Sequence, residues 1–240
     1  MTLRIAMWSG PRNLSTAMMR SFENRRDCVV WDEPFYAAYL VRTGIDHPMR
    51  EETIAAWEPD PARVAERCLG PVPEGAAVFY QKHMTHHMVA GMPLDWMDHV
   101  TNAFLIRRPE AVVASYEVKR LDLTLADLGF EDQRRLFERV CDRLGRVPPV
   151  IDADDVRRAP EGTLRALCAA VGILFDPAML HWPAGPRATD GPWAPHWYDS
   201  VWRSTGFAPP SPPQELSPAR QRIADAARPH YEALAVHALG

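Results

Sequence analysis

The 240-residue sequence predicts a doubly wound α/β domain, with a mainly parallel sheet of about five strands and helices on both faces. Five short apolar runs indicate buried strands, and stretches with helical periodicity separate them. Apolar and polar residues do not alternate cleanly within the runs, which is typical of parallel strands covered on both sides. The runs span residues 3–8, 28–32, 77–82, 103–107 and 149–152.

Helices are expected between these strands and after the last one. The predicted ranges are 14–24, 109–119, 131–144, 163–171 and 217–239. Gly172 ends the fourth helix, and Ser217-Pro218 opens the fifth as an N-cap followed by a proline at the first helical position. Strands that alternate with helices place their carboxyl ends at one edge of the sheet, where ligands of such folds bind.

The chain is expected to form one domain over residues 1–240, with two segments that stand apart. Residues 43–75 mix a short helix with several prolines and indicate an insertion that covers the sheet edge. Residues 181–214 are rich in Pro, Gly and Trp and are too long for a plain connection, which favours a lid or binding loop.

Composition excludes several classes of protein. A formal net charge of −4 argues against a general nucleic-acid binder, and the sequence contains no apolar run long enough to span a membrane. The four cysteines form no CxxC pair and are expected to be reduced thiols, and the N-terminus lacks a signal-peptide pattern. We therefore expect a cytoplasmic protein whose partner is a small molecule rather than nucleic acid or a membrane.

The first strand leads into a loop suited to binding an anion. Ser9-Gly10-Pro11-Arg12-Asn13 follows the strand, and a helix with Ser15 and Thr16 in its first turn comes next. In a strand–turn–helix unit, backbone N–H groups and the positive end of the helix dipole point into the turn. Arg12 adds charged donors. A purely structural turn remains the alternative.

This loop has the position of a Walker A motif but not its chemistry. The pattern GxxxxGK[ST] needs a lysine after the second glycine to reach terminal phosphates. Counted from Gly10, those two places hold Ser15 and Thr16. Hydrolysis of ATP or GTP is therefore disfavoured.

A second motif lies in FLIRRPEAVVASYEVKR, residues 104–120. The fourth strand ends at Arg107, Pro109 opens a helix, and Ser115 lies two turns into that helix. An arginine at the strand end and a hydroxyl from the helix can together hold a second anion.

In order and spacing the two motifs resemble those of the sulfotransferase superfamily, which has a P-loop NTPase-like fold. There a strand ends in G-x-P-[KR]-S-G-T-T and is followed later by R-[ND]-P-x-x-x-x-x-S. The resemblance implies sulfuryl transfer from 3′-phosphoadenosine 5′-phosphosulfate to a hydroxyl or amine of a small acceptor, without a metal. It departs where Asn13-Leu14 replace Ser-Gly and where Arg108 replaces Asn or Asp. The donor-binding residues that it implies are Gly10, Pro11, Arg12, Asn13, Leu14, Ser15, Thr16, Arg107, Ser115 and, in a late glycine-bearing loop, Arg187.

The resemblance also implies catalytic residues, with Arg12 stabilising charge on the donor. Glu33, after the second strand, matches the base of some branches; pairing with Arg12 or capping of the next helix is the alternative. His83, after the third strand, is the second choice of base, and neighbouring Lys82 would assist the leaving group. His83, His86 and His87 also resemble a metal cluster, but no HExxH pattern is present and no metal is expected.

Other functions remain open at this level. A nucleotide-dependent phosphotransferase would bind Mg²⁺ through Thr16 and Asp32, and a non-catalytic nucleotide or anion sensor would keep the anion-binding loop alone. The tryptophans and Tyr198 in residues 181–214 could stack on adenine, line an acceptor pocket or pack as a lid on their own core. The sequence leaves a homodimer open.

Overall fold

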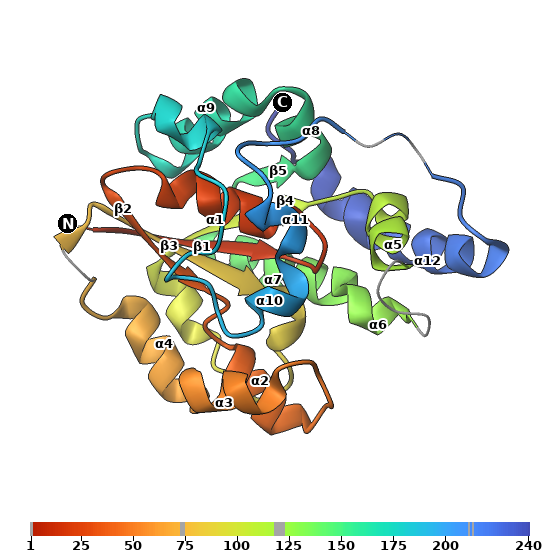
Figure 1. Cartoon of the computed structure of the whole chain (residues 1–240), viewed down its shortest axis with the longest axis horizontal. Helices are drawn as coiled ribbons and strands as arrows, with labels where there is room; N and C mark the ends of the chain where they lie inside the picture. Colours follow the sequence, from red (N-terminus) through yellow and green to blue (C-terminus); the bar gives the residue numbers. More distant parts are fainter. Residues whose placement is uncertain (1, 73–74, 118–122, 211, 213) are drawn as a thin grey trace.

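The computed structural model describes residues 2–72, 75–117, 123–210, 212 and 214–240, and within them it forms one five-stranded sheet in the order β2-β3-β1-β4-β5 (Figure 1). The strands are β1 (Leu3–Ser9), β2 (Cys28–Asp32), β3 (Val78–Met84), β4 (Thr101–Ile106) and β5 (Val150–Asp152). All four pairings are parallel. Strand β1 lies at the centre, with β3 and β2 on one side and β4 and β5 on the other, so the predicted doubly wound α/β fold is confirmed.

Strand positions follow the prediction closely, with one consequential difference. Strand β2 has the predicted bounds, but β3 runs two residues beyond the predicted end at Lys82. It does so because Trp8 and Ser9 of β1 pair with His83 and Met84. Side chains alternate between the two faces along a strand, so this extension decides where His83 points.

Each face of the sheet carries its own apolar core. Ile5 and Met7 of β1 lie in one cluster, and Ala6 and Trp8 between them lie in the other. Full burial of a large apolar side chain contributes about 1.5–3 kcal/mol. Burial on both faces explains why the strands show no polar alternation in the sequence.

The helices divide between these two faces. Figure 1 shows α2 to α4 on one side of the sheet and α8 and α9 on the other. The Trp8 face packs against α2 (Tyr36–Thr43), α4 (Pro61–Leu69), α7 (Phe130–Leu144) and α12 (Pro218–Ala235), and the Ile5 face packs against α1 (Ser15–Glu23), α8 (Ala153–Arg158) and α9 (Pro160–Val171). The remaining helices are α3 (Arg50–Ala56), α5 (Pro109–Glu117), α6 (Leu125–Leu128), α10 (Ala194–Trp197) and α11 (Asp199–Trp202), with 3₁₀ turns at Thr85–His87, Asp95–His99 and Pro177–Leu180.

Two predicted helices need comment. The last two residues of the predicted helix 109–119 lie outside the described residues. The predicted helix 217–239 is too long, because α12 ends at Ala235 and the Leu239 N–H then donates to the Val150 carbonyl of β5. The start was predicted correctly, since the Ser217 side chain accepts from the Arg220 N–H as an N-cap.

Residues 43–75 contain α3 and α4, with residues 73–74 outside the described range. Val64 and Cys68 of α4 are fully buried in the core of the Trp8 face. The Arg67 guanidinium lies over the Trp31 ring of the edge strand β2. The segment therefore covers the sheet beside its β2 edge; that it is an insertion stays a prediction.

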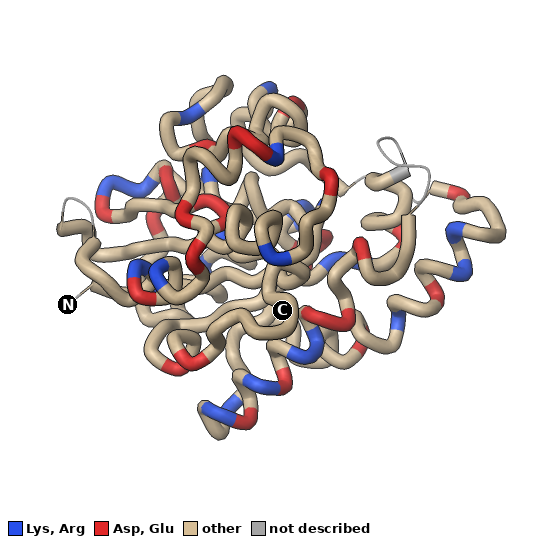
Figure 2. The backbone as a smooth tube through the Cα atoms, turned by 90° about the horizontal axis from the view of Figure 1, so that it is seen from below, with Lys and Arg blue, Asp and Glu red and all other residues tan. Residues whose placement is uncertain are grey.

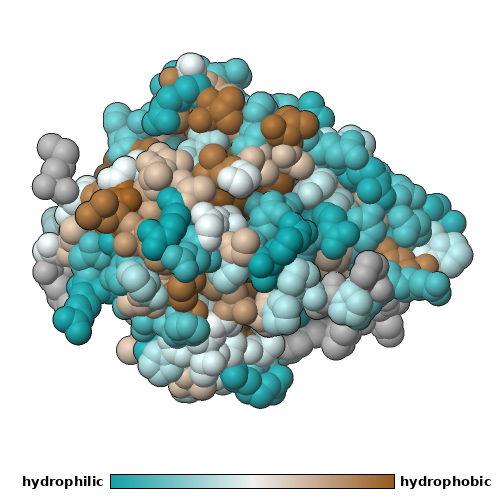
Figure 3. Space-filling view, turned by 90° about the horizontal axis from the view of Figure 1, so that it is seen from above, coloured by the Kyte–Doolittle hydropathy of each residue, from teal (hydrophilic) through white to brown (hydrophobic). Residues whose placement is uncertain are grey.

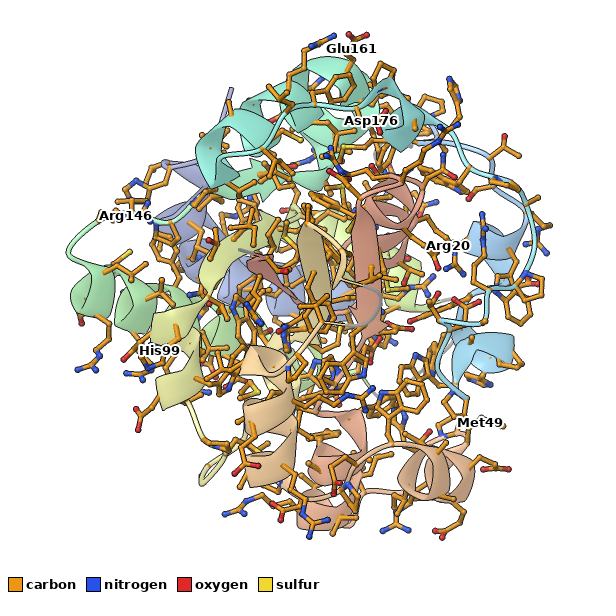
Figure 4. All side chains as sticks on the ribbon, turned by 90° about the vertical axis from the view of Figure 1, so that its left-hand side faces the viewer. Arg20, Met49, His99, Arg146, Glu161 and Asp176 are labelled. Carbon is orange, nitrogen blue, oxygen red and sulfur yellow. The ribbon has the colours of Figure 1, made fainter. Side chains whose placement is uncertain are left out.

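Residues 181–214 cross in front of the sheet as α10, α11 and their flanking loops, with 211 and 213 outside the described residues (Figure 1). Arg20 of α1 holds this segment in place through an ion pair with Asp190. The Trp202 indole N–H also donates to Asp190. Figure 4 shows Arg20 between α1 and this segment. Because Arg20 is only 1% exposed, the segment is anchored to the interior of the fold.

Charged residues of both signs and apolar groups are interspersed over the molecule. Figure 2 shows acidic and basic residues of both signs spread over the whole chain. The face seen in Figure 3 carries apolar groups separated by broad hydrophilic areas. In the part of the chain that the structure describes, no helix has both the length and the apolar character needed to cross a membrane.

Candidate active site

A cavity of about 540 Å³ lies at the carboxyl ends of the strands. Residues that follow all five strands line it, among them Arg12 after β1, Glu33 after β2, His87 after β3, Arg107 after β4 and Arg157 after β5. This is the edge at which doubly wound sheets bind their ligands. The volume is in the range of small-molecule sites.

The loop after β1 has a backbone conformation suited to binding an anion. Arg12 and Leu14 adopt left-handed conformations with φ of 60° and 68°. Leu14 is the N-cap of α1 and its side chain caps nothing; the Met18 N–H makes the first intrahelical bond, to the Leu14 carbonyl. The N–H groups of residues 15–17 therefore precede the first helical bond. Leu14 stands where the sulfotransferase motif has glycine and takes up a left-handed conformation that glycine favours.

The loop after β1 packs closely against β4 and α6. The Asn13 side-chain amide donates to the Leu105 carbonyl of β4 over 2.9 Å, so one of its two N–H donors serves the fold. A Cβ at Gly10 would come within 2.7 Å of the Leu128 carbonyl oxygen, which explains the glycine. Gly10 does not line the cavity, whereas Pro11, Asn13, Ser15 and Thr16 do.

The structure brings the two sequence motifs together. The Arg12 Nε donates to the Ser115 hydroxyl over 3.0 Å, and an Arg107 Nη donates to the Arg12 carbonyl over 2.7 Å. Burial, with the nearby charge of Arg157, lowers the pKa of Arg107 to about 10, so it stays a cation at neutral pH. Within the described residues, the buried Arg107 Nε has no hydrogen-bond partner.

At the other end of the cavity, Lys82 joins two carboxylates. Its Nζ lies 2.9 Å from Asp32 Oδ1 and 2.6 Å from Glu33 Oε1. Burial raises the pKa of Glu33, and the charge of Lys82 opposes that rise. Burial disfavours the Lys82 cation, but the two carboxylates outweigh it and raise the pKa of Lys82. Glu33 thus pairs with Lys82, whereas the sequence alternative paired it with Arg12.

Tyr198 completes this group from the segment 181–214. Its hydroxyl donates to Asp32 Oδ2 over 2.7 Å and accepts from Lys82 Nζ over 2.6 Å and from Trp193 Nε1 over 3.0 Å. An ammonium has three donors, and those of Lys82 reach Asp32, Glu33 and Tyr198. Lys82 therefore lines the cavity with its donors engaged by the protein, an arrangement that holds Glu33 and does not favour the predicted contact with a leaving group.

The magnesium pair of the phosphotransferase alternative is not assembled. Asp32 is fully buried, both of its oxygens accept hydrogen bonds, and it does not line the cavity beside Thr16. Across the described ranges, no group of three or more His, Cys, Asp or Glu side chains is arranged to hold a metal ion.

His83 does not reach the cavity. Its ring stacks on Trp8 with 4.6 Å between centroids, and its Nε2 lies 3.1 Å from Gln81 Oε1. Burial lowers the pKa of His83 to about 3. The physical reason is the extension of β3, which turns Lys82 and Met84 toward the cavity and His83 into the core of the Trp8 face. The second predicted base is therefore separated from the other site residues.

Arg187 also lies away from the cavity. Its backbone N–H donates to Asp190 and its guanidinium to the Pro183 carbonyl, within its own loop. Of the aromatic residues in the segment 181–214, some line the cavity and others pack within the segment. Trp193, Trp197 and Tyr198 line the cavity, whereas Trp182 packs against Phe207 and Trp202 bonds to Asp190.

Sequence reasoning assigned no role to Arg157 and considered His87 only as a possible metal ligand, although both line the cavity. Arg157 lies on α8 directly after β5, and His87 lies in the 3₁₀ turn after β3. The His87 ring stacks on both Tyr36 and Tyr39, and its Nε2 lies 3.9 Å from Glu33 Oε2. A search for polar residues after every predicted strand, the fifth included, would also have found Arg157.

Comparisons with known proteins agree with this arrangement. A family model described as "Sulfotransferase domain" matches residues 3–238. Two relatives from Arabidopsis thaliana, named branched-chain-amino-acid aminotransferase-like proteins 2 and 1, are each 37% identical over 97% of this chain. The chain spans only 41% and 42% of their lengths.

Three solved structures share the fold. A sulfotransferase from Alicyclobacillus acidocaldarius matches with a TM-score of 0.61 and 14% identity, over 100% of this chain and 98% of that one. The sulfotransferase domain of the Synechococcus PCC 7002 olefin synthase gives 0.53 and 20%, over 94% of each chain. The sulfotransferase domain from the curacin biosynthetic pathway gives 0.52 and 15%, over 95% of this chain and 98% of that one.

The family model covers nearly the whole chain, and the loop after β1 and the Arg107–Ser115 motif meet in one cavity at the carboxyl edge of the sheet. The chain belongs to the sulfotransferase family.

Proposed function

We propose that the chain transfers a sulfuryl group from 3′-phosphoadenosine 5′-phosphosulfate to a hydroxyl or amine of a small-molecule acceptor. The observation that carries this proposal is a single cavity that joins Arg12, Ser115 and Arg107 at one end to Glu33 at the other. One end suits a nucleotide that carries two anionic groups, and the other offers a carboxylate that can accept a proton.

The residues at the anionic end fit this donor. Arg12, Arg107 and Arg157 line the cavity, and the Nε atoms of Arg107 and Arg157 are buried without a partner among the described residues. Buried polar groups normally have partners, so unpaired guanidinium donors favour an anionic ligand. When bound, the donor supplies the sulfuryl group.

The donor-binding residues would act by position and charge. The N–H groups of residues 12–16 bind the 5′-phosphosulfate, and Arg107 and Ser115 bind the 3′-phosphate. Arg12 neutralises charge that builds up on the bridging oxygen as the bond to sulfur breaks. In-line placement of the acceptor accounts for the rest of the acceleration, and no covalent bond to the protein is needed.

Glu33 is the proposed base. Its raised pKa makes it a better proton acceptor near neutral pH than an ordinary surface carboxylate. Lys82 holds the carboxylate at the cavity wall. The proton of the acceptor hydroxyl passes to Glu33 as the acceptor oxygen bonds to sulfur.

A thermal-shift comparison of adenosine 3′,5′-bisphosphate with ATP, each with and without Mg²⁺, tests the proposal. We expect the bisphosphate to stabilise the protein selectively, and Arg107→Ala and Ser115→Ala to reduce that stabilisation. Arg146→Ala is the control, because Arg146 is exposed on the loop after α7 (Figure 4) and should leave the shift unchanged.

Other outcomes would support the alternatives. Selective stabilisation by Mg-ATP would overturn the proposal and favour a phosphotransferase. Tight binding of the bisphosphate, without sulfuryl transfer to any member of a broad panel of alcohols, phenols and amines, would favour a nucleotide sensor.

A further inference from the structure

A fourth arginine faces the donor end of the cavity from an element that neither sequence motif includes. Arg157 lies on α8, which follows β5, and lines the same cavity as Arg12, Arg107 and Arg108. We propose that Arg157 binds the 3′-phosphate of the donor together with Arg107 and Ser115, and replaces Arg187 as the further donor-binding arginine that the resemblance implied. This inference rests on the proposed function.

The charges around Arg157 favour the binding of an anion. Asp154, one turn earlier on α8, is the carboxylate close to both Arg107 and Arg157, and it already forms an ion pair with Arg108. Among the described residues, Arg12, Arg107 and Arg157 form no ion pair with a carboxylate. Burying like charges together without a counter-charge is unfavourable. A polyanionic ligand supplies that counter-charge.

The hydrogen bonds of Arg157 leave part of its guanidinium available. One Nη donates to the carbonyls of Ala208 and Pro209 at 3.3 Å each, while the buried Nε has no partner in the described ranges. Burial lowers the pKa of Arg157, as it does for Arg107. An arginine that is partly held by backbone carbonyls is already oriented, so it loses less rotamer freedom when it binds phosphate.

The same contacts link the donor site to the segment 181–214. Ala208 and Pro209 belong to that segment, and its later residues Pro212 and Gln214 line the cavity. Arg187, in contrast, bonds within its own loop and lies outside the cavity. The later residues of the segment thus lie beside the donor end of the cavity, and Arg157 contacts both this part of the segment and the cavity.

The test compares two nucleotides that differ only in the 3′-phosphate. Affinities of the whole chain for adenosine 3′,5′-bisphosphate and for adenosine 5′-monophosphate are measured by calorimetry. A charge-assisted hydrogen bond to phosphate predicts that Arg157→Ala weakens bisphosphate binding roughly tenfold to hundredfold. The same variant should change monophosphate binding by less than about twofold.

Three further variants distinguish a direct contact with phosphate from an indirect effect on the fold. Arg157→Lys keeps the charge but not the planar fork, and should recover part of the lost affinity. Arg158→Ala is the matched control on the same helix, because Arg158 is exposed and pairs with Asp155; it should bind both nucleotides like the parent chain. Arg187→Ala should also bind both nucleotides normally.

Two results would overturn the inference while leaving the proposed function intact. One is a parent chain that prefers the bisphosphate and an Arg157→Ala variant that keeps this preference. The other is an Arg157→Ala variant that loses affinity equally for both nucleotides, which would indicate a structural role or a contact with the 5′-phosphate. A parent chain with no preference for the bisphosphate would overturn the proposed function and, with it, this inference.

Discussion

The hydroxyl of Tyr198 lies 2.6 Å from the Nζ of Lys82, although 116 residues separate the two in the chain. Through this contact, the segment 181–214 completes the surroundings of the proposed base, because Lys82 also contacts Glu33. The same hydroxyl donates to the fully buried Asp32. The segment therefore forms part of the cavity wall beside Glu33.

Replacing Tyr198 by Phe should destabilise the protein by about 1–3 kcal/mol, because Asp32 Oδ2 would lose its hydroxyl donor in a buried site. Urea unfolding monitored by circular dichroism measures the change. Tyr80→Phe is a matched control, since Tyr80 is equally buried but its hydroxyl has no partner among the described residues. That control should be neutral or slightly stabilising. Equal effects of the two substitutions would contradict a structural role for the Tyr198 hydroxyl.

Replacing Glu33 by Gln should slow sulfuryl transfer by roughly 10²–10⁴-fold, because an amide cannot accept the acceptor proton. Affinity for adenosine 3′,5′-bisphosphate should be nearly unchanged, since the anion-binding groups lie at the other end of the cavity. The measurement uses the acceptor that gives the highest rate in the panel. Glu161→Gln is the control, because Glu161 is exposed on α9 (Figure 4) and pairs with Arg165. Retention of activity in Glu33→Gln would remove Glu33 as the base.

The sequence predicted the sheet well because buried parallel strands carry a local signal. Apolar runs marked all five strands, and β2 has the predicted bounds. The prediction from sequence failed at the end of β3. There His83 is a polar residue that is buried by contacts which no local pattern reveals. Its partners Trp8 and Trp96 come from other elements.

Site residues were predictable where they belong to a motif. Arg12, Arg107 and Ser115 meet in one cavity, as the resemblance implied. Arg187 was misplaced because the path of a long loop depends on distant anchors, here the ion pair between Arg20 and Asp190. Arg157 was missed because it follows the shortest strand and forms part of no recognised pattern.

Leu14 offers a direct test of the strain in the loop after β1. Its φ of 68° costs a residue with a side chain about 1–2 kcal/mol, whereas glycine adopts it freely. Leu14→Gly and Leu14→Ala remove the same apolar contacts apart from those of Cβ, so their difference reports mainly on the backbone. We expect Leu14→Gly to be more stable than Leu14→Ala by about 1 kcal/mol in urea unfolding, the reverse of the usual order at helical positions. Greater stability of Leu14→Ala would show that the left-handed conformation is not strained in this protein.

The buried histidines should make the protein sensitive to acid. Burial lowers the pKa of His83 from 6.5 to about 3 and that of His86 to about 4. Between these values and 6.5 the unfolded chain binds protons that the native state does not, so the free energy of unfolding falls as the pH falls. The stability that neutral His83 contributes is fully present above pH 6.5 and is lost as the pH drops toward 3.

His83→Phe should therefore flatten this dependence. Between pH 5.5 and 4.5 the parent chain should lose about 1.4 kcal/mol more stability than the variant, which corresponds to one proton per pH unit. Urea unfolding at both pH values measures the difference. Phe35→Leu is the control, because Phe35 packs against His83 and its loss should lower stability equally at both pH values. A His83→Phe variant with the slope of the parent chain would show that His83 already binds its proton in the native state, and that its burial does not exclude the imidazolium.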